Sequence, residues 1–157
     1  MAWASISNLA SLNSLKIKNI KGLSCFPEEM LQNLSLLESL TIREIWDLLA
    51  LPRSLASLKA LKELTIKHSP ELESLPEEGL RGLASLQELH IEDCSNVVSL
   101  SMGTRALRPL TRLRIQGSYA TALPEEVKHL ATLQVLELID FPNLTSLPDW
   151  FGDHLTS

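Results

Sequence analysis

The chain has 157 residues, of which 45% are hydrophobic and 21% are charged, and its formal net charge is −5. This length suits one domain. The net negative charge argues against nucleic acid as the main partner, because proteins that bind nucleic acid usually carry a basic surface. No apolar run approaches the roughly 18 residues that cross a bilayer, and residues 1–5 lack the basic and apolar regions of a signal peptide.

One phrase, Leu-x-x-Leu-x-x-Leu-x-Ile, recurs from residue 9 to residue 138, with leucine replacing the isoleucine in the last copy. Successive copies are 25, 24, 25, 24 and 23 residues apart. A period of roughly 20 to 29 residues with this leucine spacing predicts an α/β leucine-rich repeat solenoid of about six repeats. The third leucine of each copy, here called the central leucine, is Leu15, Leu40, Leu64, Leu89, Leu113 or Leu136.

Each Leu-x-Ile segment predicts a short strand, because side chains alternate along a strand and both apolar residues then share one face. Stacking the repeats places the strands side by side in a parallel sheet, which forms the concave face of a horseshoe arc. The residue between leucine and isoleucine then points into solvent. These outward residues are Lys16, Thr41, Thr65, His90, Arg114 and Glu137.

A proline follows the strand in five of the six repeats, and Glu-Glu follows it in three of them. Proline suits the first position of a helix, and acidic side chains suit the positive end of the helix dipole. We therefore expect one or two helical turns on each convex side, with a looser turn in repeat four, where Ser101 replaces the proline. The prolines are Pro27, Pro52, Pro76, Pro124 and Pro148.

Two cysteines, Cys25 and Cys94, lie almost three repeats apart. At about 4.8 Å per strand step this separation exceeds the reach of a disulfide. Two free thiols suit a reducing compartment, so we expect a cytoplasmic protein. Cys94 occupies the turn position that an asparagine ladder fills in other repeat classes, where Ser69, Cys94 and Ser118 can satisfy part of the backbone.

Residues 64–80, 89–100 and 144–151 resemble the C-terminal leucine-rich repeats of plant intracellular nucleotide-binding immune receptors, the disease-resistance proteins. The resemblance implies innate immunity and plant defense, with a pathogen effector, a guarded host protein or the rest of the same receptor as protein partner. It also implies a role in autoinhibition. The chain contains no G-x-x-x-x-G-K-[ST] phosphate loop, so nucleotide switching would belong to other sequence.

Residues 1–157 are expected to form a single leucine-rich repeat domain that lacks a polar cap at both ends. Solenoids need such caps, because a terminal repeat otherwise exposes its stacking face. The chain is therefore expected to be a fragment whose apolar ends favour self-association.

The concave strip carries charges whose sign alternates along the sheet, which predicts electrostatic complementarity to a protein partner. The alternative is a solvated sheet face of mixed charge. The residues expected to bind the partner are Lys16, Lys18, Arg43, Lys67, His90, Glu92, Arg112, Arg114, Gln116 and Glu137.

The chain is not expected to be an enzyme, because no nucleophile–base pair, phosphate loop or metal cluster is evident in the sequence and no cofactor is implied. His68 and His90 lie on adjacent strands, but Glu92 and Asp93 should point to opposite sides, so a metal site is not expected. The aromatic residues Trp46, Trp150 and Phe151 lie on return segments or on the last outer turn, and we expect them to pack rather than to form a partial lid.

Two rival functions stay open. One is a structural or scaffolding array, either natural or engineered, without a native ligand. The other is a substrate adaptor for ubiquitination or a small-molecule receptor.

Overall fold

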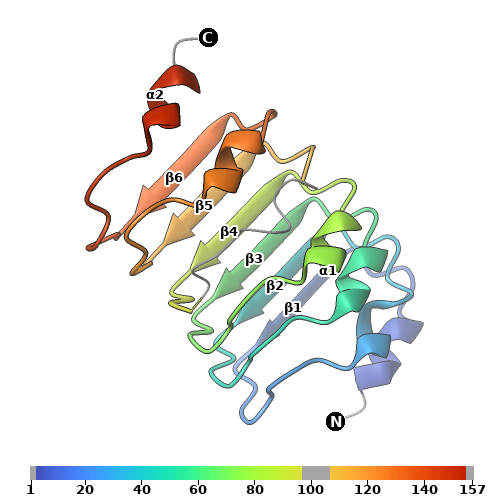
Figure 1. Ribbon diagram of the computed structural model, residues 1–157. Coiled ribbons are helices and arrows are strands. Elements are labelled where there is room, and N and C mark those ends of the chain that lie inside the picture. Colours follow the sequence, from blue (N-terminus) through green and yellow to red (C-terminus); the bar gives the residue numbers. More distant parts are fainter. Residues whose placement is uncertain (1–2, 97–106, 155–157) are drawn as a thin grey trace.

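The computed structural model describes residues 3–96 and 107–154, with side chains described to residue 151. Six parallel strands form one open sheet in the order of the sequence (Figure 1). The irregularity expected at Ser101 lies outside the described residues. The strands are β1 (Ser14–Lys18), β2 (Ser39–Arg43), β3 (Glu63–Lys67), β4 (Glu88–Glu92), β5 (Arg112–Gln116) and β6 (Val135–Ile139).

The register confirms the predicted strands. Each central leucine lies opposite the central leucine of the next strand, beginning with Leu15 opposite Leu40 and Leu40 opposite Leu64. The isoleucines pair in the same way, as Ile17 does with Ile42. Because this pairing is in phase from β1 to β6, every outward side chain has an equivalent neighbour on the adjacent strand.

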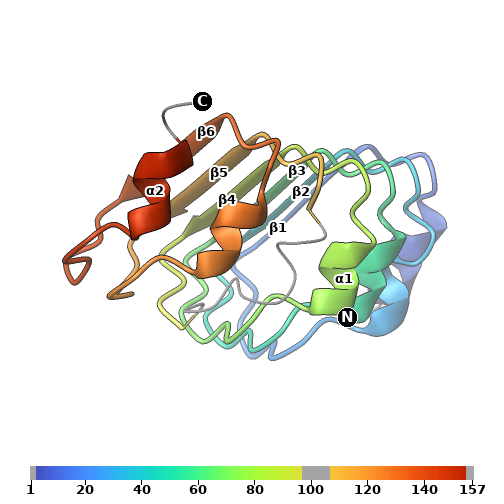
Figure 2. The same cartoon turned by 45° about the horizontal axis from the view of Figure 1, so that its top comes forward.

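Short helical turns form the second layer, on the opposite side of the molecule from the sheet (Figure 2). The prediction of convex helical turns is confirmed, but Pro27, Pro52, Pro76 and Pro124 are N-cap residues, one residue earlier than expected. The helical elements are η1 (Trp3–Asn8), η2 (Glu28–Leu31), η3 (Arg53–Ser57), α1 (Glu77–Arg81), η5 (Glu125–His129) and α2 (Asp149–His154), where η denotes a 3-10 helix.

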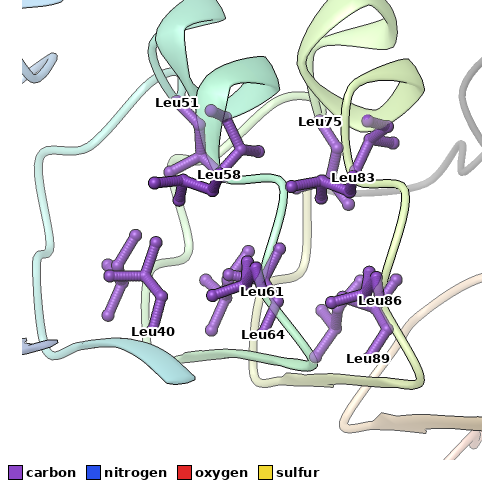
Figure 3. Close-up of a cluster of buried hydrophobic side chains, with 14 of the residues drawn as sticks. Leu40, Leu51, Leu58, Leu61, Leu64, Leu75, Leu83, Leu86 and Leu89 are labelled. Carbon is purple, nitrogen blue, oxygen red and sulfur yellow. The ribbon is translucent and has the colours of Figure 1, made fainter. Parts of the chain in front are cut away.

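The core consists of leucine columns that run between the two layers (Figure 3). Leu40, Leu64 and Leu89 stack beneath the sheet, and each is at most 1% exposed. Burying a leucine side chain contributes about 1.5–3 kcal/mol, so each repeat gains its stability by covering the next one.

At the N-terminal end, η1 contributes to the same core. The Trp3 ring meets the Phe26 ring edge-on, with centroids 5.5 Å apart. None of the helices in the described part of the chain is both long and apolar enough to cross a membrane.

A left-handed turn follows every strand, four residues after the central leucine. The backbone φ of these residues lies between 50° and 67°. The turn residue donates its N–H to the last strand residue of the next repeat, as Asn19 does to the Arg43 carbonyl. This geometry directs the chain away from the sheet at the same position in each repeat. The turn residues are Asn19, Glu44, His68, Asp93, Gly117 and Asp140.

Candidate binding surfaces

The N-terminal part of the concave face carries uncompensated positive charge. Lys16 and Lys18 on β1 are both exposed. Neither forms an ion pair with any residue that the structure describes, whereas Arg43 on β2 contacts the adjacent Glu44 carboxylate at 2.8 Å. These lysines are therefore free to meet an acidic group of a partner.

The middle of the concave face is an internal charge cluster centred on Glu92. The Lys67 ammonium lies 2.8 Å from its carboxylate, and both side chains are largely covered. His90 Nε2 lies 3.3 Å from the same carboxylate, within ion-pair range but without hydrogen-bond alignment. The hydrogen bond from Lys67 holds the pKa of Glu92 below its ordinary value. Burial, followed by the charges of Lys67 and Arg114, lowers the pKa of His90.

Towards β6 the guanidinium groups lie between carboxylates. The Arg112 side chain reaches Glu88 at 3.8 Å and Glu137 at 3.6 Å. Arg114 donates to Gln116 at 3.0 Å and lies 3.9 Å from Glu137. The expected alternation of sign is thus present, but in this part of the face the opposite charges neutralise one another across strands.

A polar hollow of about 320 Å³ lies between these groups. Its lining includes Glu63 and Glu88, which are not among the residues predicted to bind a partner. Both precede a central leucine and therefore share the outward parity of His90 and Arg114. The alternation of side chains along a strand is therefore enough to predict that both residues face outward.

The structure corrects the placement of Asp93. It was expected to point away from Glu92, but its left-handed backbone, with φ of 50°, ends the strand alternation. One ligand atom each from His68, Glu92 and Asp93 lies within 4.8 Å of the others. His68 Nδ1 lies 3.0 Å from Asp93 Oδ2, and the Lys67 ammonium lies 2.8 Å from the Glu92 carboxylate, so these groups form a polar cluster.

A second depression, here called the rim groove, runs along the loops beyond the strand ends and has a volume of about 480 Å³. Its walls include Trp46, Pro70, Tyr119 and Pro142, each six residues after a central leucine. The turn residues His68, Asp93, Gly117 and Asp140 also line it.

The packing expected for Trp46 is wrong, because the residue is 54% exposed at the rim groove. Trp150 is partly buried against the core, as expected. Phe151 lies beside it, with ring centroids 6.0 Å apart.

Five residues after each central leucine, next to the rim groove, the side chains satisfy only part of the hydrogen bonding. Cys94 Sγ donates to the Glu92 carbonyl at 3.4 Å, and Ser118 Oγ accepts from the Ala120 N–H at 3.2 Å. The Ser69 hydroxyl is buried and has no hydrogen-bond partner among the described residues, contrary to expectation. Burial raises the pKa of the Cys94 thiol to about 11, so this cysteine is unreactive at neutral pH. Both Cys94 and the exposed Cys25 are free thiols.

Comparison with known proteins identifies the fold. No family model matches the chain, and no curated protein matches it. The leucine-rich repeat domain of the type III effector XopL is 35% identical and superposes with a TM-score of 0.78, over 94% of this chain and 51% of that one. This chain therefore spans about half the length of that domain.

Two more distant structures share the architecture. TLR13, solved in complex with ssRNA13, is 23% identical, with a TM-score of 0.74 over 92% of this chain and 22% of its own. A leucine-rich repeat protein of Leptospira interrogans is also 23% identical, with a TM-score of 0.67 over 87% of this chain and 41% of its own. With its six in-phase strands, the chain is a leucine-rich repeat solenoid, a fold that offers extended surfaces to partners.

Proposed function

We propose that the chain is a protein-recognition module whose concave face binds an acidic surface of a protein partner. One observation carries the proposal: Lys16 and Lys18 are exposed and lack ion pairs within the described residues, whereas cations on β2–β5 already have carboxylate neighbours. Unpaired charges attract a partner without first breaking an internal contact, so they favour fast and selective association.

The biological setting that we favour is the recognition part of a plant disease-resistance receptor in the cytoplasm. The phrases at residues 64–80 and 144–151 support it, as does the presence of two free cysteines. The partner would then be a pathogen effector, a guarded host protein or another part of the receptor.

A second setting has support from the 35% identity to the XopL repeat domain. In this alternative the chain is the repeat part of an effector protein and binds a host protein. A nucleotide-binding domain encoded directly upstream would favour the receptor, and a secretion signal upstream would favour the effector.

The structure guides the choice of test residues. Reversing Arg43, Lys67, Arg112 or Arg114 would break internal ion pairs and disturb the sheet as well as any interface. The double variant Lys16→Glu with Lys18→Glu avoids this problem. Lys21→Glu is the control for position, because Lys21 lies beyond the end of β1 and is also exposed without an ion pair in the described part of the chain.

The experiment compares pull-downs from host extract, with bound proteins identified by mass spectrometry. We expect a specific protein that the native chain and Lys21→Glu retain and that the double variant loses. Circular dichroism checks that all three proteins are folded. Equal capture by all three would contradict binding through the β1 end of the concave face.

A further inference from the structure

The rim groove combines exposed aromatic rings with negative charge. Trp46 is 54% exposed and Tyr119 is 63% exposed, although large aromatic side chains are usually covered. Asp93 and Asp140 contribute two carboxylates to the lining, and no described lining residue is lysine or arginine. Aromatic faces and carboxylates both attract guanidinium groups, so this surface suits arginine side chains.

The carboxylates remain accessible in the folded chain. The Asp93 side chain is 50% exposed, and only its Oδ2 atom faces His68, at 3.0 Å. Asp140 is exposed and accepts one long hydrogen bond, of 3.4 Å, from Gln116. Each carboxylate therefore retains acceptor capacity for a bound cation.

The repeat geometry fixes the spacing of the two carboxylates. Asp93 and Asp140 are equivalent turn residues of β4 and β6, two strand steps apart, which corresponds to about 9.6 Å. In a polyproline II helix, residues i and i+3 lie on the same edge about 9.3 Å apart. Aromatic grooves are also the surfaces on which polyproline II segments usually dock.

We propose that the rim groove binds a basic polyproline II segment of a partner protein, with arginine at positions i and i+3 facing Asp93 and Asp140. The intervening prolines pack against Tyr119, whose repeat lies between those of the two carboxylates. Residues that precede the first arginine would continue along the groove towards Trp46, whose strand β2 lies two strand steps, about 9.6 Å or three polyproline II residues, from β4. The groove adjoins the concave face but contains neither Lys16 nor Lys18, so the inference does not rest on the proposed function.

The probe is the peptide acetyl-Gly-Arg-Pro-Pro-Arg-Gly-amide, titrated into the ¹⁵N-labelled chain and followed by NMR. We expect saturable shifts of the Gly117 and Tyr119 amides, which lie between the two carboxylates. Replacing both arginines with citrulline keeps the shape and removes the charge, and shortening the spacer to one proline breaks the i,i+3 spacing. Both peptides should bind about tenfold more weakly.

The protein variant is Asp93→Asn with Asp140→Asn, because asparagine tolerates the left-handed turn. It should bind the arginine peptide about tenfold more weakly than the native chain. Glu29→Gln with Glu126→Gln removes the same charge from the convex side and should bind normally, as should the Lys16 and Lys18 double variant. The strand amide shifts verify folding. Absence of saturable shifts, equal binding of the citrulline or one-proline peptide, or unchanged binding by the asparagine variant would overturn the proposal.

Discussion

The Glu28 carboxylate accepts a hydrogen bond from the backbone N–H of Arg53, at 3.0 Å, in the next repeat. Its second oxygen accepts from the Ser54 N–H at 2.9 Å. These N–H groups begin η3, whose N-cap Pro52 supplies no side-chain hydrogen bond and whose first turn contains no acidic residue. An acidic side chain of one repeat therefore caps the helix of its neighbour, which couples the two convex turns.

Glu28→Ala should lower the free energy of unfolding by about 1 kcal/mol, because N-capping side chains contribute about 0.5–2 kcal/mol. Urea denaturation followed by circular dichroism measures the change. Glu29→Ala is the control: it removes the same charge from the same helical turn, and no described hydrogen bond involves that carboxylate. Equal effects of the two variants would contradict a capping role for Glu28.

Comparing two glycines distinguishes the cost of a left-handed backbone from the cost of a steric clash. Gly22 and Gly117 have nearly the same φ, 69° and 67°. A Cβ atom at residue 22 would meet nothing within 4 Å, whereas one at residue 117 would lie 2.0 Å from Asp93 Oδ1. Gly22→Ala should therefore cost about 1–2 kcal/mol from the left-handed backbone alone.

Gly117→Ala should destabilise the chain more than Gly22→Ala, because the Asp93 side chain must also move. Urea denaturation of both variants gives the difference. Introducing Asp93→Gly together with Gly117→Ala should reduce the extra loss, because no carboxylate then remains to collide with the new methyl group. Equal losses for the two single variants would contradict this close approach.

The sheet and its register followed from the sequence because each repeat offers only one way to bury its leucines. Shifting Leu40 and Ile42 by one residue would turn both into solvent, so the apolar pattern determines which residues face outward. The pairing of Lys67 with Glu92 was accessible by the same reasoning, since both follow an isoleucine by one residue.

The left-handed turn was harder to recognise, because residues of very different preference occupy it. Asn19, Asp93 and Gly117 suit positive φ, as His68 also does, but Glu44 does not indicate it. The rim groove was missed for a related reason. Trp46 and Tyr119 lie between the leucine positions, where the repeat pattern does not dictate burial, and only the turn geometry brings them to one surface.

The buried Ser69 hydroxyl predicts a stabilising substitution. A buried polar group without a hydrogen bond costs about 1–3 kcal/mol, and the Ser69 Oγ atom has no partner among the described residues. Ser69→Ala should raise the free energy of unfolding by about 1 kcal/mol, measured by urea denaturation. Ser118→Ala is the control, because that hydroxyl accepts from the Ala120 N–H and its loss should destabilise. A loss of stability in Ser69→Ala would show that the hydroxyl has a partner.

The Glu92 cluster predicts an acid-sensitive fold. Burial lowers the pKa of His90 below its ordinary value of 6.5, so below that pH the unfolded chain binds a proton that the native chain resists. Stability should therefore fall as the pH drops from 6.5 towards the native pKa of His90. The pKa of Glu92 is also lowered, from 4.5, so its contribution is present above that pH and is lost as the pH falls through its native pKa.

His90→Gln tests this explanation, because it removes the titration of His90 and leaves that of Glu92. Urea denaturation at about pH 7 and about pH 5 should show a smaller loss of stability in this variant than in the native chain. His68→Gln is the control, since it removes a neighbouring imidazole from the same cluster while His90 keeps its burial. A loss between these two pH values that is unchanged in His90→Gln would mean that His90 titrates alike in the folded and unfolded chains. The acid response would then have to come from other groups, and the charges of Lys67 and Arg114 would have no measurable effect on this imidazole.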